Sequence, residues 1–237
     1  MQDLWNAFGR AFDLIASADA DLGEIIALSL SVSLTAVLLA TLLALPLGAL
    51  LALVRFPGRG LLVALLNAFM GLPPVVVGLV VYLLLSRSGP LGTLGLLFTP
   101  GAMIVAQSIL VTPIIAAVAR QSLADLDGEY RPLLRSLGAG PWRSVPTLLW
   151  DARLSLGTAV LAGFGRASGE VGAVMIVGGN IDHVTRTMTT AIALETSKGH
   201  LAQALALGIV LISIALLVAL GMELLRLLAA RQQGQAS

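Results

Sequence analysis

Five long runs of apolar residues restrict what this chain can fold into. Each run is close to or above the ~20 residues that an α-helix needs to cross the hydrocarbon core of a bilayer. Only a helix satisfies all of its own backbone hydrogen bonds there without a partner segment. The pattern therefore predicts about five transmembrane helices. The runs are 25–54, 61–85, 101–119, 154–177 and 201–228.

The composition agrees with a lipid environment for most of the chain. Hydrophobic residues make up 57% of the 237 positions and charged residues 11%, and the mean hydropathy is +0.96. A soluble core of this size does not need so large an apolar share. We therefore expect a single all-α, polytopic transmembrane domain over residues 1–237.

The segment before the first run, 1–23, is acidic and contains one basic residue, Arg10. This is the reverse of the basic start of a secretory signal peptide. Apolar residues recur at helical spacing from Leu4 to Ile15, which predicts an amphipathic helix lying on the outer membrane surface. A frayed terminus is the alternative.

The basic residues give an orientation, because Lys and Arg accumulate in cytoplasmic loops. With the amino terminus outside, nine of the 14 basic residues face the cytoplasm, four lie outside, and Arg166 falls within a span. We therefore expect an external amino terminus and a cytoplasmic carboxyl terminus. The nine are Arg55, Arg59, Arg120, Arg131, Arg135, Arg143, Arg153, Arg226 and Arg231.

Several activities are excluded by what the sequence lacks. It has no cysteine and therefore no disulfide or thiolate chemistry. The only lysine, Lys198, is followed by glycine, so no P-loop for ATP is present. The two histidines, His183 and His200, lack the spacing of a helical metal pair. With a net charge of +1 and no basic tract, nothing indicates nucleic-acid binding. We expect neither an enzyme nor a metal or other cofactor bound by this chain.

The long polar loop 120–153 has a pattern of its own. Polar and leucine positions alternate at roughly helical spacing over 125–137, and Gly138, Gly140 and Pro141 then break the helix. A short helix followed by a sharp turn can fit a groove of another protein and transmit its movement to the adjacent spans. The alternative is an amphipathic loop helix that rests on the lipid headgroups.

This loop resembles the cytoplasmic coupling loop of ABC importer permeases. Leu137, Gly138 and Ala139 match the Leu-Gly-Ala of that motif, while 132–134 occupy the positions of its Glu-Ala-Ala. The segments 72–92, 164–181 and 185–199 resemble the molybdate and tungstate group of these permeases, and 185–199 is most similar to its tungstate branch. The resemblance implies these ATPase-coupling residues: Arg135, Leu137, Gly138, Ala139, Trp142 and Arg143.

The resemblance also implies a type I importer fold and partners. A homodimer in a bacterial or archaeal cell (inner) membrane would dock on a cytoplasmic ATPase dimer, which uses ATP and Mg²⁺. An extracytoplasmic binding protein would deliver the oxyanion, tungstate first and molybdate next. Gly165 and Gly169 form a G-x-x-x-G pattern, which suggests the fourth span as the subunit interface; chance is the alternative among 25 glycines.

Several polar or helix-breaking residues fit a path for a tetrahedral dianion. Pro73 and Pro74 permit a kink or local unwinding beside a cavity, or a simple bend. Arg166 and Glu170 share a helical face, where we expect them to neutralise each other or to pair between subunits. They then act either as a transient anion site or as a static lock. The region 180–190 is rich in hydroxyl and amide groups. Residues 189–191 suggest the start of a partial helix whose amino end faces the pore, or the region is an ordinary external loop. Its candidate residues are Asn180, Thr189 and Thr190.

Two other functions remain open at this point. A proton- or sodium-coupled anion carrier without partners would use Glu170 as its titratable group, although the chain shows no inverted repeat of the kind such carriers have. An ATP-independent membrane scaffold would need neither Arg166 nor the threonines.

Overall fold

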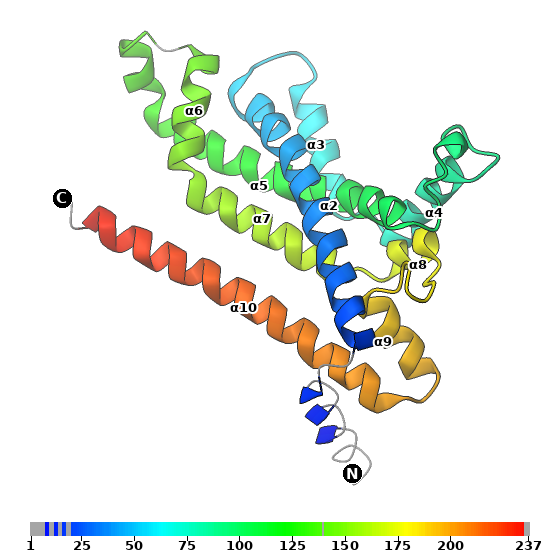
Figure 1. Ribbon diagram of the computed structural model, residues 1–237. Coiled ribbons are helices and arrows are strands. Elements are labelled where there is room, and N and C mark those ends of the chain that lie inside the picture. Colours follow the sequence, from blue (N-terminus) through cyan, green and yellow to red (C-terminus); the bar gives the residue numbers. More distant parts are fainter. Residues whose placement is uncertain (1–7, 10–11, 14–15, 18–19, 139, 235–237) are drawn as a thin grey trace. The chain divides into compact units, whose positions relative to one another are not determined.

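The computed structural model describes residues 8–9, 12–13, 16–17, 20–138 and 140–234. Every regular element in those ranges is helical (Figure 1), so the all-α prediction is confirmed. Most of the predicted amphipathic segment 1–23 lies outside the described residues. The elements are α2 (Ala20–Leu53), α3 (Arg59–Phe69), α4 (Pro74–Leu85), the 3-10 helix η1 (Gly92–Leu94), α5 (Pro100–Ser136), α6 (Pro141–Asp151), α7 (Arg153–Ser168), α8 (Gly172–Gly178), α9 (Met188–Ser197) and α10 (Leu201–Gly234).

Three of these helices, α2, α5 and α10, contain stretches long and apolar enough to cross a membrane by themselves. The helix pairs α3–α4 and α7–α8 each add one span if a bent pair counts as a single crossing. Among the described residues there are therefore three candidate spans, or five with the bent pairs. The predicted five correspond to the larger number.

The second apolar run is not one continuous helix. α3 ends at Phe69, α4 begins at Pro74, and the two axes differ by 103°. Pro73 is extended (φ −65°, ψ 123°), and Pro74 takes the first turn of α4. Proline has no N–H to donate and forces the preceding residue out of the helical region. The structure therefore has the local unwinding that the prolines permit, and not a simple bend.

The fourth apolar run is also broken, which the sequence did not predict. α7 ends at Ser168, α8 begins at Gly172, and their axes differ by 59°. The break coincides with Gly169 and Glu170, so the residues expected on one continuous helical face lie at the end of α7 and just beyond it.

The polar loop 120–153 also differs from the expectation. The predicted helix over 125–137 is not separate, because α5 continues without interruption from Pro100 to Ser136. The predicted turn is present, since Gly138 has a left-handed φ of +73°, a conformation that glycine adopts without steric cost. The separate short helix follows the turn as α6, with Pro141 in its first turn.

The chain forms two compact units, each built from several segments. Unit 1 contains Met1–Ala36, Pro73–Gln107 and Gly165–Val218. Unit 2 contains Val37–Leu72, Ser108–Phe164 and Ala219–Ser237.

The core of unit 2 joins α2, α5, α6 and α7 through small and aliphatic side chains. Gly48 on α2 lies so close to α5 that a Cβ on it would be 2.9 Å from Ala119 Cβ. Such a short approach requires a small residue on each helix. The buried cluster consists of Ala49, Ala52, Leu53, Ala119, Leu123, Leu148, Ala152 and Leu156.

Unit 1 contains a similarly tight contact between α4 and α8 (Figure 1). A Cβ on Gly78 would lie 2.7 Å from the Ala173 Cα atom, so the backbones of the two helices touch. A second cluster packs α9 against α10 and the start of α2, with Met188, Ala191 and Leu207 buried at its centre.

Candidate functional site

The break between α7 and α8 gathers polar groups inside unit 1. Glu170 is 3% exposed, and both of its carboxylate oxygens are engaged. Oε2 accepts a hydrogen bond from Arg166 Nη1 at 2.5 Å, and Oε1 accepts one from the Ala173 backbone N–H at 3.1 Å. The carboxylate thus pairs with a cation and also satisfies a backbone donor in the first turn of α8.

Gln107 on α5 belongs to the same cluster, although the sequence interpretation did not include it. Its side-chain N–H donates to the Ala167 carbonyl at 3.0 Å, which also accepts from the Glu170 backbone N–H at 3.1 Å, so Gln107 ties α5 to the break after α7. Gln107 is 3% exposed, and its Oε1 atom has no partner among the described residues. A glutamine in an apolar run was the available signal, because buried polar groups are costly unless they are bonded.

The start of α9 meets this cluster through Thr189, whose hydroxyl donates to the Glu170 carbonyl oxygen at 2.9 Å. Thr187 and Thr190 form a reciprocal capping box at the first turn, with the Thr187 N–H donating to Thr190 Oγ1 at 3.0 Å. The Met188 N–H donates to Ser29 Oγ of α2. The partial helix expected at 189–191 exists and begins one residue earlier, at Met188. Thr189, Thr190 and these donors are engaged within the chain, so their contact with an anion stays a prediction.

Asn180 lies at the other end of α8, in the turn that follows it. It has a φ of +50°, and its side-chain Oδ1 is buried with no partner among the described residues. Thr185 fixes this turn, because it donates to the Gly178 carbonyl at 2.6 Å and accepts from the Ile181 N–H at 2.9 Å. Asn180 is therefore separated from Glu170 by the length of α8.

The two helix breaks lie next to each other. A Cβ on Gly172, at the start of α8, would be 2.9 Å from Val75 Cγ2 and 3.5 Å from Glu170 Oε1. The start of α4, which Pro73 and Pro74 set, is therefore close to the Glu170 carboxylate. The structure brings together Pro74, Arg166, Glu170 and Thr189, which the sequence had placed in three separate segments. Backbone irregularity at membrane depth is tolerated where protein or a cavity surrounds it.

The predicted coupling residues lie in unit 2, around the turn between α5 and α6. Leu137 is 74% exposed, and Gly138 and Arg143 are also exposed. Ala139 lies outside the described residues, and the side chains of Arg135 and Trp142 are not described. Exposed Leu133 and Trp150 add apolar surface nearby in the sequence, on α5 and α6. Large exposed apolar side chains on a polar loop are typical of a protein-binding surface.

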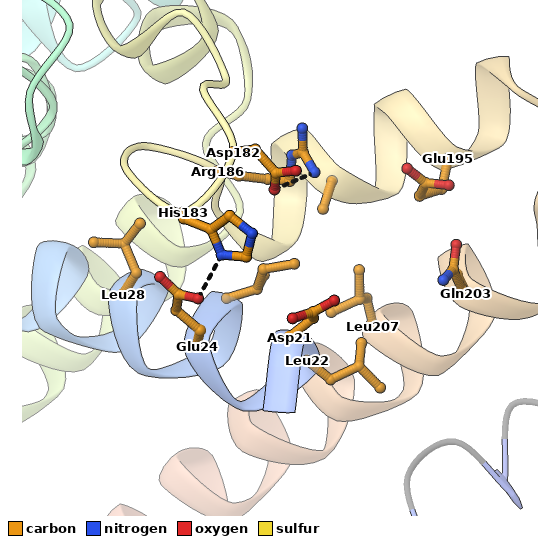
Figure 2. A pocket seen from close by; sticks show the side chains of 12 residues that line it. Asp21, Leu22, Glu24, Leu28, Asp182, His183, Arg186, Glu195, Gln203 and Leu207 are labelled. Carbon is orange, nitrogen blue, oxygen red and sulfur yellow. Dashed lines mark hydrogen bonds and ion pairs between the residues drawn. The ribbon is translucent and has the colours of Figure 1, made fainter. Parts of the chain in front are cut away.

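A polar pocket lies in unit 1, between the starts of α2 and α10, the α8–α9 loop and α9 (Figure 2). Its volume is about 130 Å³. His183 Nδ1 lies 2.8 Å from Glu24 Oε2, and Arg186 donates to Asp182 at 2.6 Å. Glu195 pairs with Lys198 and His200, and the Lys198 hydrogen bond is the largest cause that lowers the pKa of Glu195.

The His183–Glu24 contact predicts a pH-dependent stability. The hydrogen bond to Glu24 and the negative charge of Glu24 raise the pKa of His183. Protonated His183 thus stabilises the folded chain below its ordinary pKa, and this contribution is lost as the pH rises through the raised pKa. The melting temperature of the purified chain should exceed that of Glu24→Gln most at about pH 6, and the difference should close toward about pH 8.

The histidine itself provides the control for that titration. In a His183→Gln background, Glu24→Gln should change the melting temperature by the same small amount at every pH in this window. A melting-temperature difference between the original chain and Glu24→Gln that grows as the pH rises would contradict stabilisation by protonated His183.

Comparison with known proteins agrees with this architecture. Residues 44–231 match the family model described as binding-protein-dependent transport system inner membrane component. The solved structure of the methionine ABC transporter MetNI, in an inward-facing conformation, has a TM-score of 0.70 with 19% identity. The match covers 86% of this chain and 92% of that one. This likeness shows a shared fold.

Three curated relatives cover most of the chain. The tungstate uptake permease TupB of Peptoclostridium acidaminophilum is 40% identical over 90% of this chain and 94% of its own length. A probable anion ABC transporter permease of Haloferax volcanii is 43% identical over 81% and 85%. The molybdenum transport permease ModB of Escherichia coli is 34% identical over 83% and 92%. The chain therefore belongs to the binding-protein-dependent transport system inner membrane component family, as an ABC transporter permease of the molybdate and tungstate group.

Proposed function

We propose that this chain is the membrane permease through which an ATP-driven importer takes up tungstate, with molybdate as the next substrate. The observation that carries the choice of tungstate is the 40% identity to a tungstate uptake permease over nearly the full length of both chains. The identity to the molybdenum permease is lower, at 34%. Both ions are tetrahedral dianions, so ligand shape does not rank them. The higher sequence identity to the tungstate permease supports tungstate as the first substrate.

Permeases of this family work with an ATPase and a substrate-binding protein. The proposed orientation follows the positive-inside pattern, with the amino terminus outside and the turn at Gly138 in the cytoplasm. The ATPase would contact exposed Leu137, Gly138 and Arg143, together with Arg135, Ala139 and Trp142. Because α5 is continuous from Pro100 to Ser136, a displacement at this turn would pass along one uninterrupted helix toward the membrane.

The anion would pass near the paired helix breaks in unit 1. Arg166 is 32% exposed, whereas its partner Glu170 is 3% exposed. The guanidinium N–H groups of Arg166 beyond Nη1 have no partner among the described residues, and they remain able to contact a passing oxyanion. Glu170 offsets much of the positive charge, so the contact would be weak enough for release.

We also propose that two copies of the chain form the pathway. Gly165 and Gly169 are both exposed, and a Cβ on Gly165 would meet nothing within 4 Å in this chain. A Cβ on Gly169 would meet only the Gly165 carbonyl, at 3.4 Å. Among the described residues no other helix packs against these two glycines, so they are available to a helix of a second copy. The purified complex should contain two permease chains for two ATPase subunits.

The proposal predicts tungstate-stimulated ATP hydrolysis in proteoliposomes. This chain would be reconstituted with its ATPase and binding protein, and tungstate, molybdate and sulfate would be added in turn. We expect several-fold stimulation that requires the binding protein and is strongest with tungstate. Uptake driven by a proton or sodium gradient in liposomes that hold this chain alone would support the ion-coupled carrier instead.

A matched variant separates loss of coupling from loss of folding. Leu137→Asp removes an apolar side chain that is 74% exposed, so the fold should be unaffected. The variant should retain the melting temperature of the original chain and lose the substrate-stimulated hydrolysis. Full stimulation with Leu137→Asp would show that the turn does not transmit force.

A further inference from the structure

A second cavity, unrelated to the helix breaks, lies in unit 2 at the end of α2. It has a volume of about 310 Å³. Three small residues, Ala52, Ala124 and Gly128, form part of its lining, so the backbones of α2 and α5 border the open space. The charged residues of its lining are Arg55, Arg59, Arg131 and Asp127. With three guanidinium groups and one carboxylate, the cavity has an excess of two positive charges.

The arginines of this cavity differ in how far the chain itself uses them. Arg59 donates from Nε to the Leu51 carbonyl at 2.6 Å and from Nη2 to the Ala52 carbonyl at 3.4 Å. It thereby satisfies carbonyls in the last turn of α2. Arg131 donates from Nε and Nη2 to a single oxygen of Asp127. The side chains of Arg131 and Asp127 are only 26% and 13% exposed.

Arg55 differs from the other two arginines of this cavity. It is exposed, and it has no hydrogen bond or ion pair to any described residue. An arginine that lines a positively charged cavity and neither caps a helix nor pairs with a carboxylate is suited to an external anion. The planar guanidinium group matches the oxygens of a phosphate in a bidentate manner.

The surroundings indicate that this anion belongs to a lipid. Arg59 is the first residue of α3, and the turns that follow it expose apolar side chains. Leu61 is 66% exposed, Leu62 45% and Leu65 41%. A soluble anion would leave these apolar side chains uncovered. The acyl chains of a lipid would cover them once its headgroup lay among the arginines. Basic pockets at the ends of membrane helices have the chemistry to hold anionic headgroups.

We propose that this cavity binds the phosphate headgroup of an anionic phospholipid, with Arg55 as the residue that recognises it. The bound lipid would hold the short connection between α2 and α3 against α5. The site does not depend on the transported ion, so it can be tested independently of the cargo.

The test compares lipid binding to the purified full-length chain by native mass spectrometry. Phosphatidylglycerol is the anionic probe, and phosphatidylcholine is the zwitterionic control with the same phosphate. We expect a phosphatidylglycerol complex that phosphatidylcholine does not form to the same extent. Arg55→Gln should weaken it about fivefold, which corresponds to the loss of one basic residue near an anionic lipid, and Arg55→Lys, which keeps the charge but loses the planar fork, should weaken it less.

The matched control is Arg87→Gln, which removes the same charge from an exposed arginine in unit 1. It should leave phosphatidylglycerol binding unchanged. Both glutamine variants should melt at the temperature of the original chain without lipid, because Arg55 makes no bond within the described chain. Equal phosphatidylglycerol binding by Arg55→Gln and the original chain would overturn the proposal. Inorganic phosphate that displaces the lipid and stabilises the chain through Arg55 by itself would assign the site to a free anion instead.

Discussion

Glu170→Ala is expected to destabilise the permease by about 3 kcal/mol or more, the cost of removing one partner from a buried ion pair. The substitution leaves the Arg166 guanidinium without its carboxylate and the Ala173 N–H without its acceptor, both of which contact Glu170 in the structure. It removes the side-chain links to α7 and α8, whereas the bond from Thr189 of α9 goes to the backbone carbonyl of residue 170 and is kept by alanine. Thermal unfolding of the detergent-purified chain would measure the loss.

Two further variants show whether the charge pair itself is responsible. Glu170→Gln keeps an acceptor for Ala173 but leaves Arg166 unpaired, so it should be almost as damaging as alanine. The double variant Arg166→Gln, Glu170→Gln removes both charges and should recover part of the stability, because an isolated charge costs more than a neutral pair. A double variant that is less stable than either single variant would contradict a structural lock.

Transport by the same double variant addresses the second role of the pair. If Arg166 also contacts the passing anion, the double variant should fold and yet import tungstate more slowly than the original chain. Unchanged import would restrict the pair to its structural role.

Gly78→Ala is expected to cost about 2 kcal/mol, within the range for overpacking a close-packed contact. The added Cβ would lie 2.7 Å from the Cα atom and 3.1 Å from the carbonyl oxygen of Ala173. Both atoms are backbone, so no side chain can rotate to relieve the clash, and α4 and α8 must separate. The melting temperature should fall by several degrees, and the arrangement of the two helix breaks should loosen with it.

The same substitution at a position without neighbours is the control. A Cβ on Gly208 in α10 would meet nothing within 4 Å, and alanine is the better helix former by about 1 kcal/mol. Gly208→Ala should therefore leave stability unchanged or raise it, opposite in sign to Gly78→Ala. Equal effects at both positions would show that helix propensity, and not the α4–α8 contact, sets the result.

Properties encoded locally were predictable from the sequence. Apolar run length is a local quantity, and it identified the segments that form the long helices and the bent pairs. The i, i+4 spacing of Arg166 and Glu170 predicted an ion pair, which the structure contains. Pro73 and Pro74 marked a break in the second run because proline restricts the backbone whatever surrounds it. Gly138 marked the turn after α5 for a similar reason.

The polarity of the sequence did not predict where α5 ends. The third apolar run stops at Ala119, but α5 continues to Ser136. The change from apolar to polar residues marks a change of solvent and not the end of a helix, since the following alanine, leucine, arginine and glutamate residues are themselves good helix formers. The sequence interpretation therefore placed a separate helix where the structure has the last turns of a long one.

The contacts between distant segments were decided by the tertiary structure alone. Gln107 reaches Ala167 across 60 positions, and His183 reaches Glu24 across 159. The approach of α4 to α8 depends on Gly78 and Ala173 meeting backbone to backbone. Periodicity and composition describe each segment's own preference for lipid, water or helix, whereas a long-range contact depends on how two separately formed surfaces fit. The sequence by itself therefore determined which segments are apolar and helical and that prolines interrupt the second run, and only the tertiary structure revealed the α7–α8 break and placed it beside the start of α4.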